Sequence, residues 1–133
     1  MKRANETILV VEDDPNSATL LIDLLTAHGY RVINEGTGLA ATKRLSEERV
    51  DLILLDLRLP EQNGFMVAET LKRNPATARI PIIVVSAHND RQNRLRAYRS
   101  GVNMVLSKPI DLAELVLIVA NLLAVTRPVP VTE

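Results

Sequence analysis

Three consecutive carboxylates, Glu12, Asp13 and Asp14, directly follow an apolar run, residues 7–11. Like charges at this spacing repel one another, so the arrangement lowers stability unless a cation, a helix terminus or solvent relieves it. Asp14 precedes Pro15, and this pair is typical of a helix N-cap and the first helical position. We therefore assign Asp14 to a helix cap, which leaves Glu12 and Asp13 as candidate ligands of a cation.

Three further polar residues, Asp56, Ser86 and Lys108, stand at the ends of later apolar runs. If the runs are parallel strands of one sheet, their carboxyl ends meet at one rim, where such sheets bind ligands. Carboxylates, a hydroxyl and an ammonium gathered there would suit a hard divalent cation and a phosphoryl group. Mg²⁺ prefers oxygen ligands and usually binds through one or two carboxylates plus a phosphate. The residue types therefore predict a site for Mg²⁺ and phosphoryl chemistry.

The elements that must position these residues follow from the hydropathy pattern. Five short runs indicate strands, and the third and fourth lack polar alternation, as strands covered on both faces do. The second run is more polar, which favours a place near the sheet edge. The predicted strands are residues 7–11, 30–35, 50–57, 80–87 and 103–107. Segments with helical period lie between and after them, namely a helix from Pro15 that stops at Gly29, then 37–48, 64–73, 90–100 and 111–124.

Strict alternation of strand and helix predicts an α/β fold. Five β-α units imply a doubly wound five-stranded parallel sheet with right-handed crossovers and five helices, a three-layer sandwich. The last segment, 126–133, contains two prolines, which prevent regular helix or sheet. We therefore expect one domain over residues 6–125 and a flexible C-terminal tail over 126–133.

Composition excludes several classes of function. Sixteen basic residues balance sixteen acidic ones, so no overall charge favours nucleic acid or an anionic membrane. The most apolar stretch, residues 112–125, is shorter than the ~20 residues that span a bilayer. The chain contains no cysteine, which suits a reducing compartment. We expect a cytoplasmic domain that binds neither nucleic acid nor membrane directly.

Four motifs in this order resemble the receiver domains of two-component response regulators. They are LVVEDDP, DLILLDLRLPEQNG, IIVVSAH and SKP, and the likeness spans residues 7–124. One such motif is weak evidence, but four of them on a five-fold β-α alternation are specific. The resemblance, which is to receiver domains of the chemotaxis-regulator type, implies a flavodoxin-like sheet of order 2-1-3-4-5. It also implies a signalling domain that assists its own phosphorylation and dephosphorylation, rather than an enzyme.

The resemblance gives each chemical group a role. Asp56 would be the phosphoacceptor, a carboxylate nucleophile that takes a phosphoryl group from a phosphohistidine. The donor would be a sensor histidine kinase or a histidine phosphotransfer protein. Lys108 would pair with Asp56 at rest and with the phosphoryl oxygens afterwards, and Ser86 would donate its hydroxyl to them. The Lys108–Pro109 peptide bond would be cis.

The resemblance also implies a set of metal ligands. Asp13, Asp56 and the backbone carbonyl of Arg58 would bind Mg²⁺ directly, whereas Glu12 would act through water. Arg58 and His88 each lie two residues past a site residue, so both could border the phosphoryl group and modulate attack by water. Solvated loop residues are the alternative interpretation of these two side chains.

The chain departs from the family at one position. Typical members carry Tyr or Phe three residues before the lysine, and its ring turns inward on activation, but this chain has Val105. A valine cannot make that movement, so the chemistry looks intact while its transmission looks unusual. A receiver-like interaction module that works without phosphorylation is the first alternative. A haloacid-dehalogenase-type phosphatase is a weaker one, because its second catalytic Asp would stand where this chain has Arg58.

The surface for an output partner is less specific. Helix 90–100 carries four arginines, and in the family this helix and the fifth, here 111–124, often form the output surface. A basic patch there could select an acidic protein partner, although a solvated helix face explains the same pattern. The sequence contains no recognisable DNA-binding or enzymatic output segment. We expect a stand-alone regulator that acts through protein contacts, and a piece cut from a longer protein is the alternative.

Overall fold

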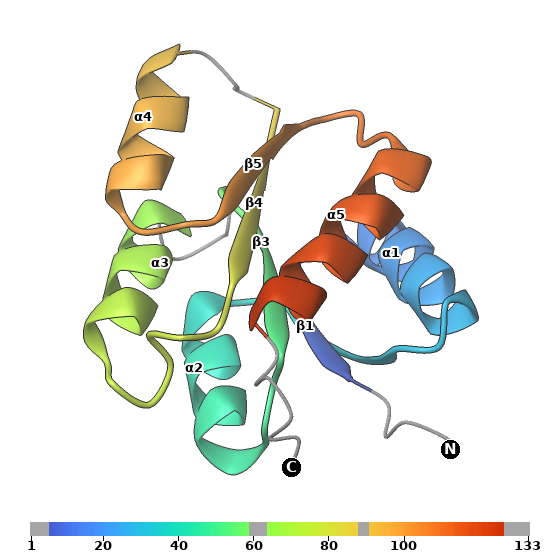
Figure 1. Ribbon diagram of the computed structural model, residues 1–133, viewed down its shortest axis with the longest axis horizontal. Coiled ribbons are helices and arrows are strands. Elements are labelled where there is room, and N and C mark those ends of the chain that lie inside the picture. Colours follow the sequence, from blue (N-terminus) through green and yellow to red (C-terminus); the bar gives the residue numbers. More distant parts are fainter. Residues whose placement is uncertain (1–5, 59–63, 88–90, 127–133) are drawn as a thin grey trace, which may run out of the picture.

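The computed structural model describes residues 6–58, 64–87 and 91–126 (Figure 1). Strands and helices alternate along this part of the chain, as the sequence predicts. In chain order they are β1 (Thr7–Val11), α1 (Pro15–Ala27), β2 (Arg31–Glu35), α2 (Gly38–Glu47), β3 (Leu52–Asp56), α3 (Gly64–Arg73), β4 (Ile82–Ser86), α4 (Arg91–Arg99), β5 (Met104–Ser107) and α5 (Leu112–Thr126).

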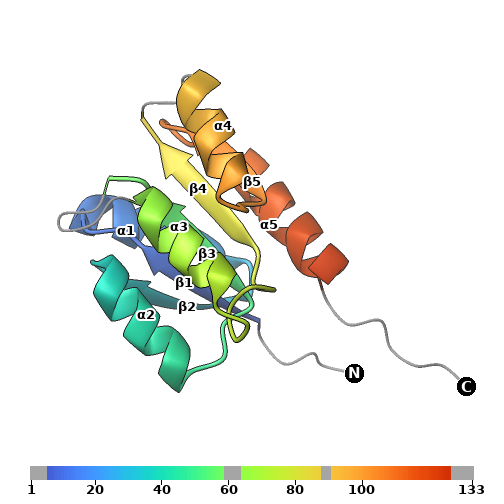
Figure 2. The same ribbon diagram turned by 90° about the vertical axis from the view of Figure 1, so that its left-hand side faces the viewer.

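The five strands form one parallel sheet of order β2-β1-β3-β4-β5. Helices α1 and α5 cover one face, and α2, α3 and α4 cover the other (Figure 1), as the turned view in Figure 2 also shows. The predicted doubly wound, flavodoxin-like three-layer fold is therefore confirmed. Because the strands are parallel, all five carboxyl ends lie at the same rim of the sheet.

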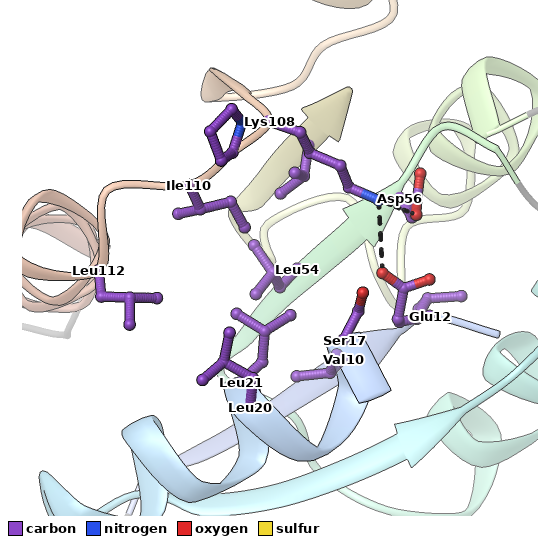
Figure 3. A pocket seen from close by; sticks show the side chains of 13 residues that line it. Val10, Glu12, Ser17, Leu20, Leu21, Leu54, Asp56, Lys108, Ile110 and Leu112 are labelled. Atoms are coloured by element: carbon purple, nitrogen blue, oxygen red, sulfur yellow. Dashed lines mark hydrogen bonds and ion pairs between the residues drawn. The ribbon is translucent and has the colours of Figure 1, made fainter. Parts of the chain in front are cut away.

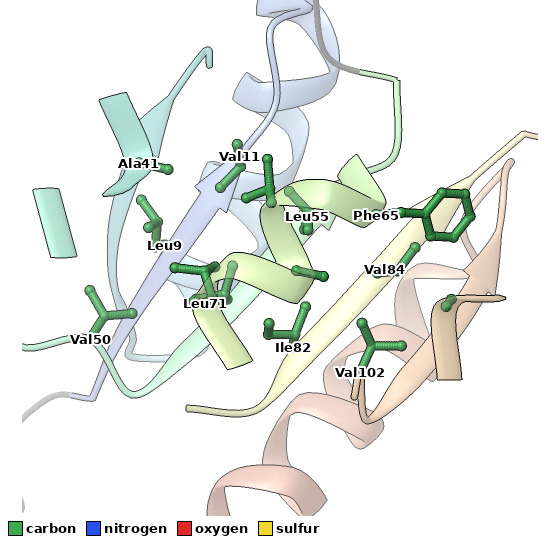
Figure 4. Close-up of a cluster of buried hydrophobic side chains, with 14 of the residues drawn as sticks. Leu9, Val11, Ala41, Val50, Leu55, Phe65, Leu71, Ile82, Val84 and Val102 are labelled. Atoms are coloured by element: carbon green, nitrogen blue, oxygen red, sulfur yellow. The ribbon is translucent and has the colours of Figure 1, made fainter. Parts of the chain in front are cut away.

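The core lies on both faces of the three central strands. Every residue of β1, β3 and β4 is buried, which explains why these runs show no polar alternation. One apolar cluster packs beneath α2, α3 and α4 and includes Leu9, Leu55, Val84 and Leu71 (Figure 4). A second cluster lies under α1 and α5. The edge strand β2 has one buried residue, Ile33, in agreement with its more polar sequence.

The helix termini carry the expected signals. Asp14 caps α1, because its Oδ2 accepts hydrogen bonds from the backbone N–H and the hydroxyl of Ser17, at 3.0 and 2.7 Å. Gly29, with φ +91°, follows the helix in the left-handed conformation that glycine adopts without strain. Asp111 caps α5 by accepting from the N–H of Glu114 at 3.1 Å. Across the described residues, no helix combines the length and apolarity needed to cross a membrane.

The predicted boundaries need small corrections. Strand β1 has the predicted bounds, and the other four strands are shorter than the apolar runs. Strand β4, for example, begins at Ile82, after a proline that cannot donate a ladder hydrogen bond. Helix α5 continues to Thr126, past the predicted helix end at 124 and into the predicted tail. The first proline of the tail, Pro128, restricts only the residue directly before it, so it allows helix up to this point. Residues 127–133 lie outside the described part of the chain.

Candidate functional site

The carboxyl ends of neighbouring strands bring three carboxylates together. Glu12 follows β1, Asp56 ends β3, and β1 and β3 are adjacent in the sheet. Carboxylate oxygens of Glu12, Asp13 and Asp56 all lie within 4.8 Å of one another. Glu12 and Asp56 are buried, with 5% and 6% of their surface exposed, whereas Asp13 faces solvent. The cluster is thus rooted in the core and open on one side.

Lys108 supplies the positive charge of this cluster. Its Nζ donates a hydrogen bond to Asp56 Oδ2 at 2.7 Å and lies 3.5 Å from Glu12 Oε1 (Figure 3). The residue directly follows β5 and precedes a cis peptide bond to Pro109. The ammonium therefore links the segments after β1 and β5 to the end of β3.

The electrostatics of the cluster follow from burial and charge. Burial raises the pKa of Glu12 above its usual value and the charge of Asp56 adds to this, while the N–H of Asp14 and the Lys108 ammonium oppose it. Burial alone would lower the pKa of Lys108, but the carboxylates of Asp56 and Glu12 outweigh burial and raise it. Lys108 is accordingly protonated at neutral pH and offsets part of the negative charge of the site.

Asp56 is held on both of its oxygens. While Oδ2 accepts from Lys108, Oδ1 accepts from the backbone N–H of Arg58 at 2.8 Å. On the other side of β3, the register pairs Asp56 with Val85 of β4. Ser86, the next residue of β4, is buried at the same rim, with 2% of its surface exposed. The structure thus brings the predicted acceptor, lysine and hydroxyl residue to one end of the sheet.

Comparison with known proteins identifies the family. The family model described as "Response regulator receiver domain" matches residues 8–120 of the chain. The chain is a response regulator receiver domain. Among curated relatives, the polar-differentiation response regulator DivK of Brucella anthropi is 36% identical over 106 residues, which cover 80% of this chain and 86% of DivK. Receiver domains of this family generally serve signalling.

Solved structures agree with this assignment. The receiver domain of the sensor histidine kinase PA1611 from Pseudomonas aeruginosa PAO1, solved with a magnesium ion in its active site cleft, is 32% identical, with a TM-score of 0.83 over 91% of this chain and 99% of that one. The signal receiver domain of a histidine kinase from Syntrophus aciditrophicus is also 32% identical, with a TM-score of 0.86 over 96% and 98%. Several curated relatives are longer proteins, of which this chain spans 28% to 51%.

A pocket of about 260 Å³ opens beside the carboxylates of the receiver domain. Its polar lining consists of Glu12, Ser17, Asp56 and Lys108. Figure 3 shows apolar side chains from α1, from the strands and from the chain around the start of α5 forming the rest of the wall. Leu20 of α1 and Ile110 belong to this apolar wall, and Leu20 is 54% exposed. The sequence did not reveal this pocket, because its walls come from separate segments whose distance no hydropathy pattern fixes.

The remaining predicted residues of the receiver domain lie in different environments or outside the described part of the chain. Arg58 is exposed in the loop after β3. Val105 is buried in β5 and belongs to the apolar cluster under α2, α3 and α4. His88 lies outside the described residues. Asn34 is not among the predicted residues, although its side chain donates to the backbone carbonyls of Val10 and Glu12. Its signal in the sequence is an amide near the end of a predicted strand, where Asn is uncommon.

Proposed function

We propose that this receiver domain accepts a phosphoryl group on Asp56 from a phosphohistidine and transmits the event through protein contacts. The observation that carries the proposal is the Lys108 ammonium 2.7 Å from Asp56 Oδ2, within a cluster whose three carboxylates lie within 4.8 Å of one another. Phosphoryl transfer requires mainly positioning and charge neutralisation, and this cluster is suited to both. Family membership supports the same reaction.

The donor set fits a hard divalent cation. Asp13, Asp56 and the backbone carbonyl of Arg58 would hold Mg²⁺, and Glu12 would act through water. Oxygen ligands and an opening to solvent at Asp13 suit an ion that keeps several of its waters. When bound, Mg²⁺ would neutralise negative charge on the phosphoryl oxygens. The related PA1611 receiver domain, with its magnesium ion, supports this assignment.

The proposed reaction balances without a further reactant. A carboxylate oxygen of Asp56 forms a bond to phosphorus, the bond from phosphorus to the donor imidazole nitrogen breaks, and that nitrogen leaves with the bonding electron pair. The product is an acyl phosphate on Asp56. Lys108, which is protonated, then pairs with the phosphoryl oxygens, and the Ser86 hydroxyl donates to them. Both side chains thereby favour the phosphorylated state.

Receiver domains of response regulators interact with histidine kinases and with output domains. For this chain we propose that a kinase or a histidine phosphotransfer protein delivers the phosphoryl group through the opening beside Asp56, because the pocket there is continuous with the site. For output we propose the surface of α4 and α5. Helix α4 contains four arginines and no carboxylate, and its Leu95 and Tyr98 are exposed, which favours an acidic partner with an apolar contact.

The first experiment is the intact mass of the protein after incubation with acetyl phosphate, with and without Mg²⁺. Wild type should gain one phosphoryl group in a Mg²⁺-dependent reaction, and Asp56→Asn should gain none. Asp51→Asn is a matched control, because Asp51 lies directly before β3, at the opposite end from Asp56, and its carboxylate accepts from the N–H of Thr7. If wild type gains no phosphoryl group from either acetyl phosphate or a phosphorylated histidine kinase, the proposal is overturned.

A further inference from the structure

Asn34 lies on the edge strand β2, directly opposite Val10 of β1. Its side-chain Nδ2 donates to two backbone carbonyls of the neighbouring segment, those of Val10 at 2.9 Å and Glu12 at 3.2 Å. These two carbonyls flank Val11, the last residue of β1. One amide of the edge strand therefore spans the point at which β1 ends and the acidic segment begins.

Besides Asn34, both neighbouring strands hold the backbone at this point, because Val11 also pairs with Leu55 of β3. The ladder between β1 and β2 ends with the pair Val11 and Glu35, and the N–H of Glu12 then donates to Glu35 O at 3.0 Å. Beyond this, the N–H of Asp14 donates to Glu12 Oε2 at 3.2 Å. The amide of Asn34 thus holds the Glu12 carbonyl, from which the chain continues to Asp13.

The carboxylates make this contact consequential. The three carboxylates repel one another, so moving Glu12 and Asp13 away from Asp56 at the end of β3 would lower the electrostatic energy. Hydrogen bonds to the backbone oppose such a movement. Because a cation needs the carboxylates to stay close together, a residue that holds the backbone also preserves the geometry of the ligands.

We propose that Asn34 is a positioning residue of the cation site, which acts through the backbone of Glu12. The inference rests on the proposed function, because its effect is on Mg²⁺ held by the carboxylates. Asn34 carries no charge and is exposed, so neither a charge nor burial in the core would account for its influence on Mg²⁺ binding. It acts by its two hydrogen bonds, and their removal weakens Mg²⁺ binding without abolishing the fold.

The test is calorimetric titration of Mg²⁺ into wild type, Asn34→Ala and Asn103→Ala, because the chain has no tryptophan for a fluorescence assay. Asn103 is a matched control: its Oδ1 accepts from the N–H of Ile82 at 3.0 Å, at the opposite end of the sheet. Both variants should lose some thermal stability. Only Asn34→Ala should bind Mg²⁺ more weakly, by about 3- to 10-fold, at or below the lower end of typical outer-shell effects.

A second variant separates position from charge. Asn34→Asp adds a negative charge near the cluster, which by itself strengthens Mg²⁺ binding, but it removes the donor and turns an acceptor toward two carbonyls. We expect its affinity to fall below that of wild type. Wild-type affinity in Asn34→Ala would reduce Asn34 to a cap of the strand edge and overturn the inference. A wild-type protein that binds no Mg²⁺ would overturn the metal site of the proposed function, and the inference with it.

Discussion

Lys108 and Asp56 are 52 residues apart in sequence, yet the Nζ of one lies 2.7 Å from Oδ2 of the other. The lysine side chain is 32% exposed and that of Asp56 is 6% exposed, so the carboxylate depends on its partner more than the ammonium does. Burial is costly for an unpaired charge. The pair therefore stabilises the resting site, and it also places a cation where Mg²⁺ would be attracted.

Lys108→Ala should consequently bind Mg²⁺ more tightly than wild type while being less stable without it. A unit charge about 6 Å away is worth about 1–3 kcal/mol for dielectric constants between that of water and the effective value of about 20 near a protein surface, so the gain in affinity should be about tenfold. The measurement is the thermal midpoint as a function of Mg²⁺ concentration, because a ligand of the folded state raises it.

Lys72→Ala provides the control for this prediction. Lys72 is also partly buried and donates to the carbonyls of Ala78 and Ile80, on the segment that leads to β4. Its loss should lower stability but leave the response to Mg²⁺ unchanged. Equal Mg²⁺ responses of both variants and wild type would show that Lys108 does not compete with the cation.

The fold was largely predictable because the buried strands have a recognisable apolar pattern in the sequence. Residues 52–56 and 82–86 are apolar up to the last position, and short runs of this kind are typical of strands covered on both faces. Polar residues at the strand ends then indicated the rim, since parallel strands align their carboxyl ends. The strand order came from the family resemblance rather than from the pattern.

The contacts between elements were not predictable in this way. The role of Asn34 depends on its register opposite Val10, and a shift of one residue would place its side chain on the other face of the sheet. The pocket beside Lys108 depends on the spacing of α1 and the segment before α5. Likewise, the arginines of α4 looked alike in sequence, although one of them, Arg96, stacks on an aromatic ring.

That contact yields a second prediction, on how α4 is attached. The guanidinium carbon of Arg96 lies 4.4 Å from the centroid of the Phe65 ring on α3. A stacked cation of this kind is worth about 0.5–1 kcal/mol at an exposed site. Arg96→Ala should therefore lower the free energy of unfolding by about this much more than Arg99→Ala, an identical change on the same helix. Chemical denaturation measures both, and equal losses would contradict the role of the stacked pair.

A third prediction concerns the pH dependence of stability. Side-chain hydrogen bonds from Arg31 and Arg44, at 2.6 and 2.8 Å, lower the pKa of Glu48 below 4.5. Because the pKa is lower in the folded state, the contribution of Glu48 is fully present above about pH 4.5 and is lost as the pH falls through the folded value. Glu48→Gln should reduce stability at pH 7 and flatten its decline in acid.

Glu47→Gln is the control for this titration. Glu47 is the exposed neighbour of Glu48, and no arginine pairs with it among the ion pairs of the described residues. Thermal unfolding of both variants between pH 3 and 7 would separate the effect of the arginine pairs from the general effect of removing an acid. This pH range covers the ordinary carboxyl pKa of about 4. Parallel profiles for the two variants would refute the prediction.

The last prediction concerns Gly64, the first residue of α3, which packs against the backbone directly after Asp56, the proposed phosphoacceptor. A Cβ at this position would lie 2.6 Å from the Cα of Leu57 and 2.9 Å from the carbonyl oxygen of Asp56. Neither atom belongs to a flexible side chain, so the backbone itself would have to move. Gly64→Ala should lower stability by about 1–3 kcal/mol, although alanine is otherwise the better helix former.

Gly36→Ala is the matched substitution, because a Cβ there would meet only the Cα of Asp13, at 3.9 Å. It should change stability by less than about 0.5 kcal/mol. Denaturant unfolding gives the first readout, and the rate of phosphoryl uptake from acetyl phosphate gives the second. Displacement of Leu57 also displaces Asp56, so Gly64→Ala should slow uptake under conditions in which it remains folded. A stable Gly64→Ala with a wild-type rate would show that the close contact of Gly64 with Leu57 does not position Asp56.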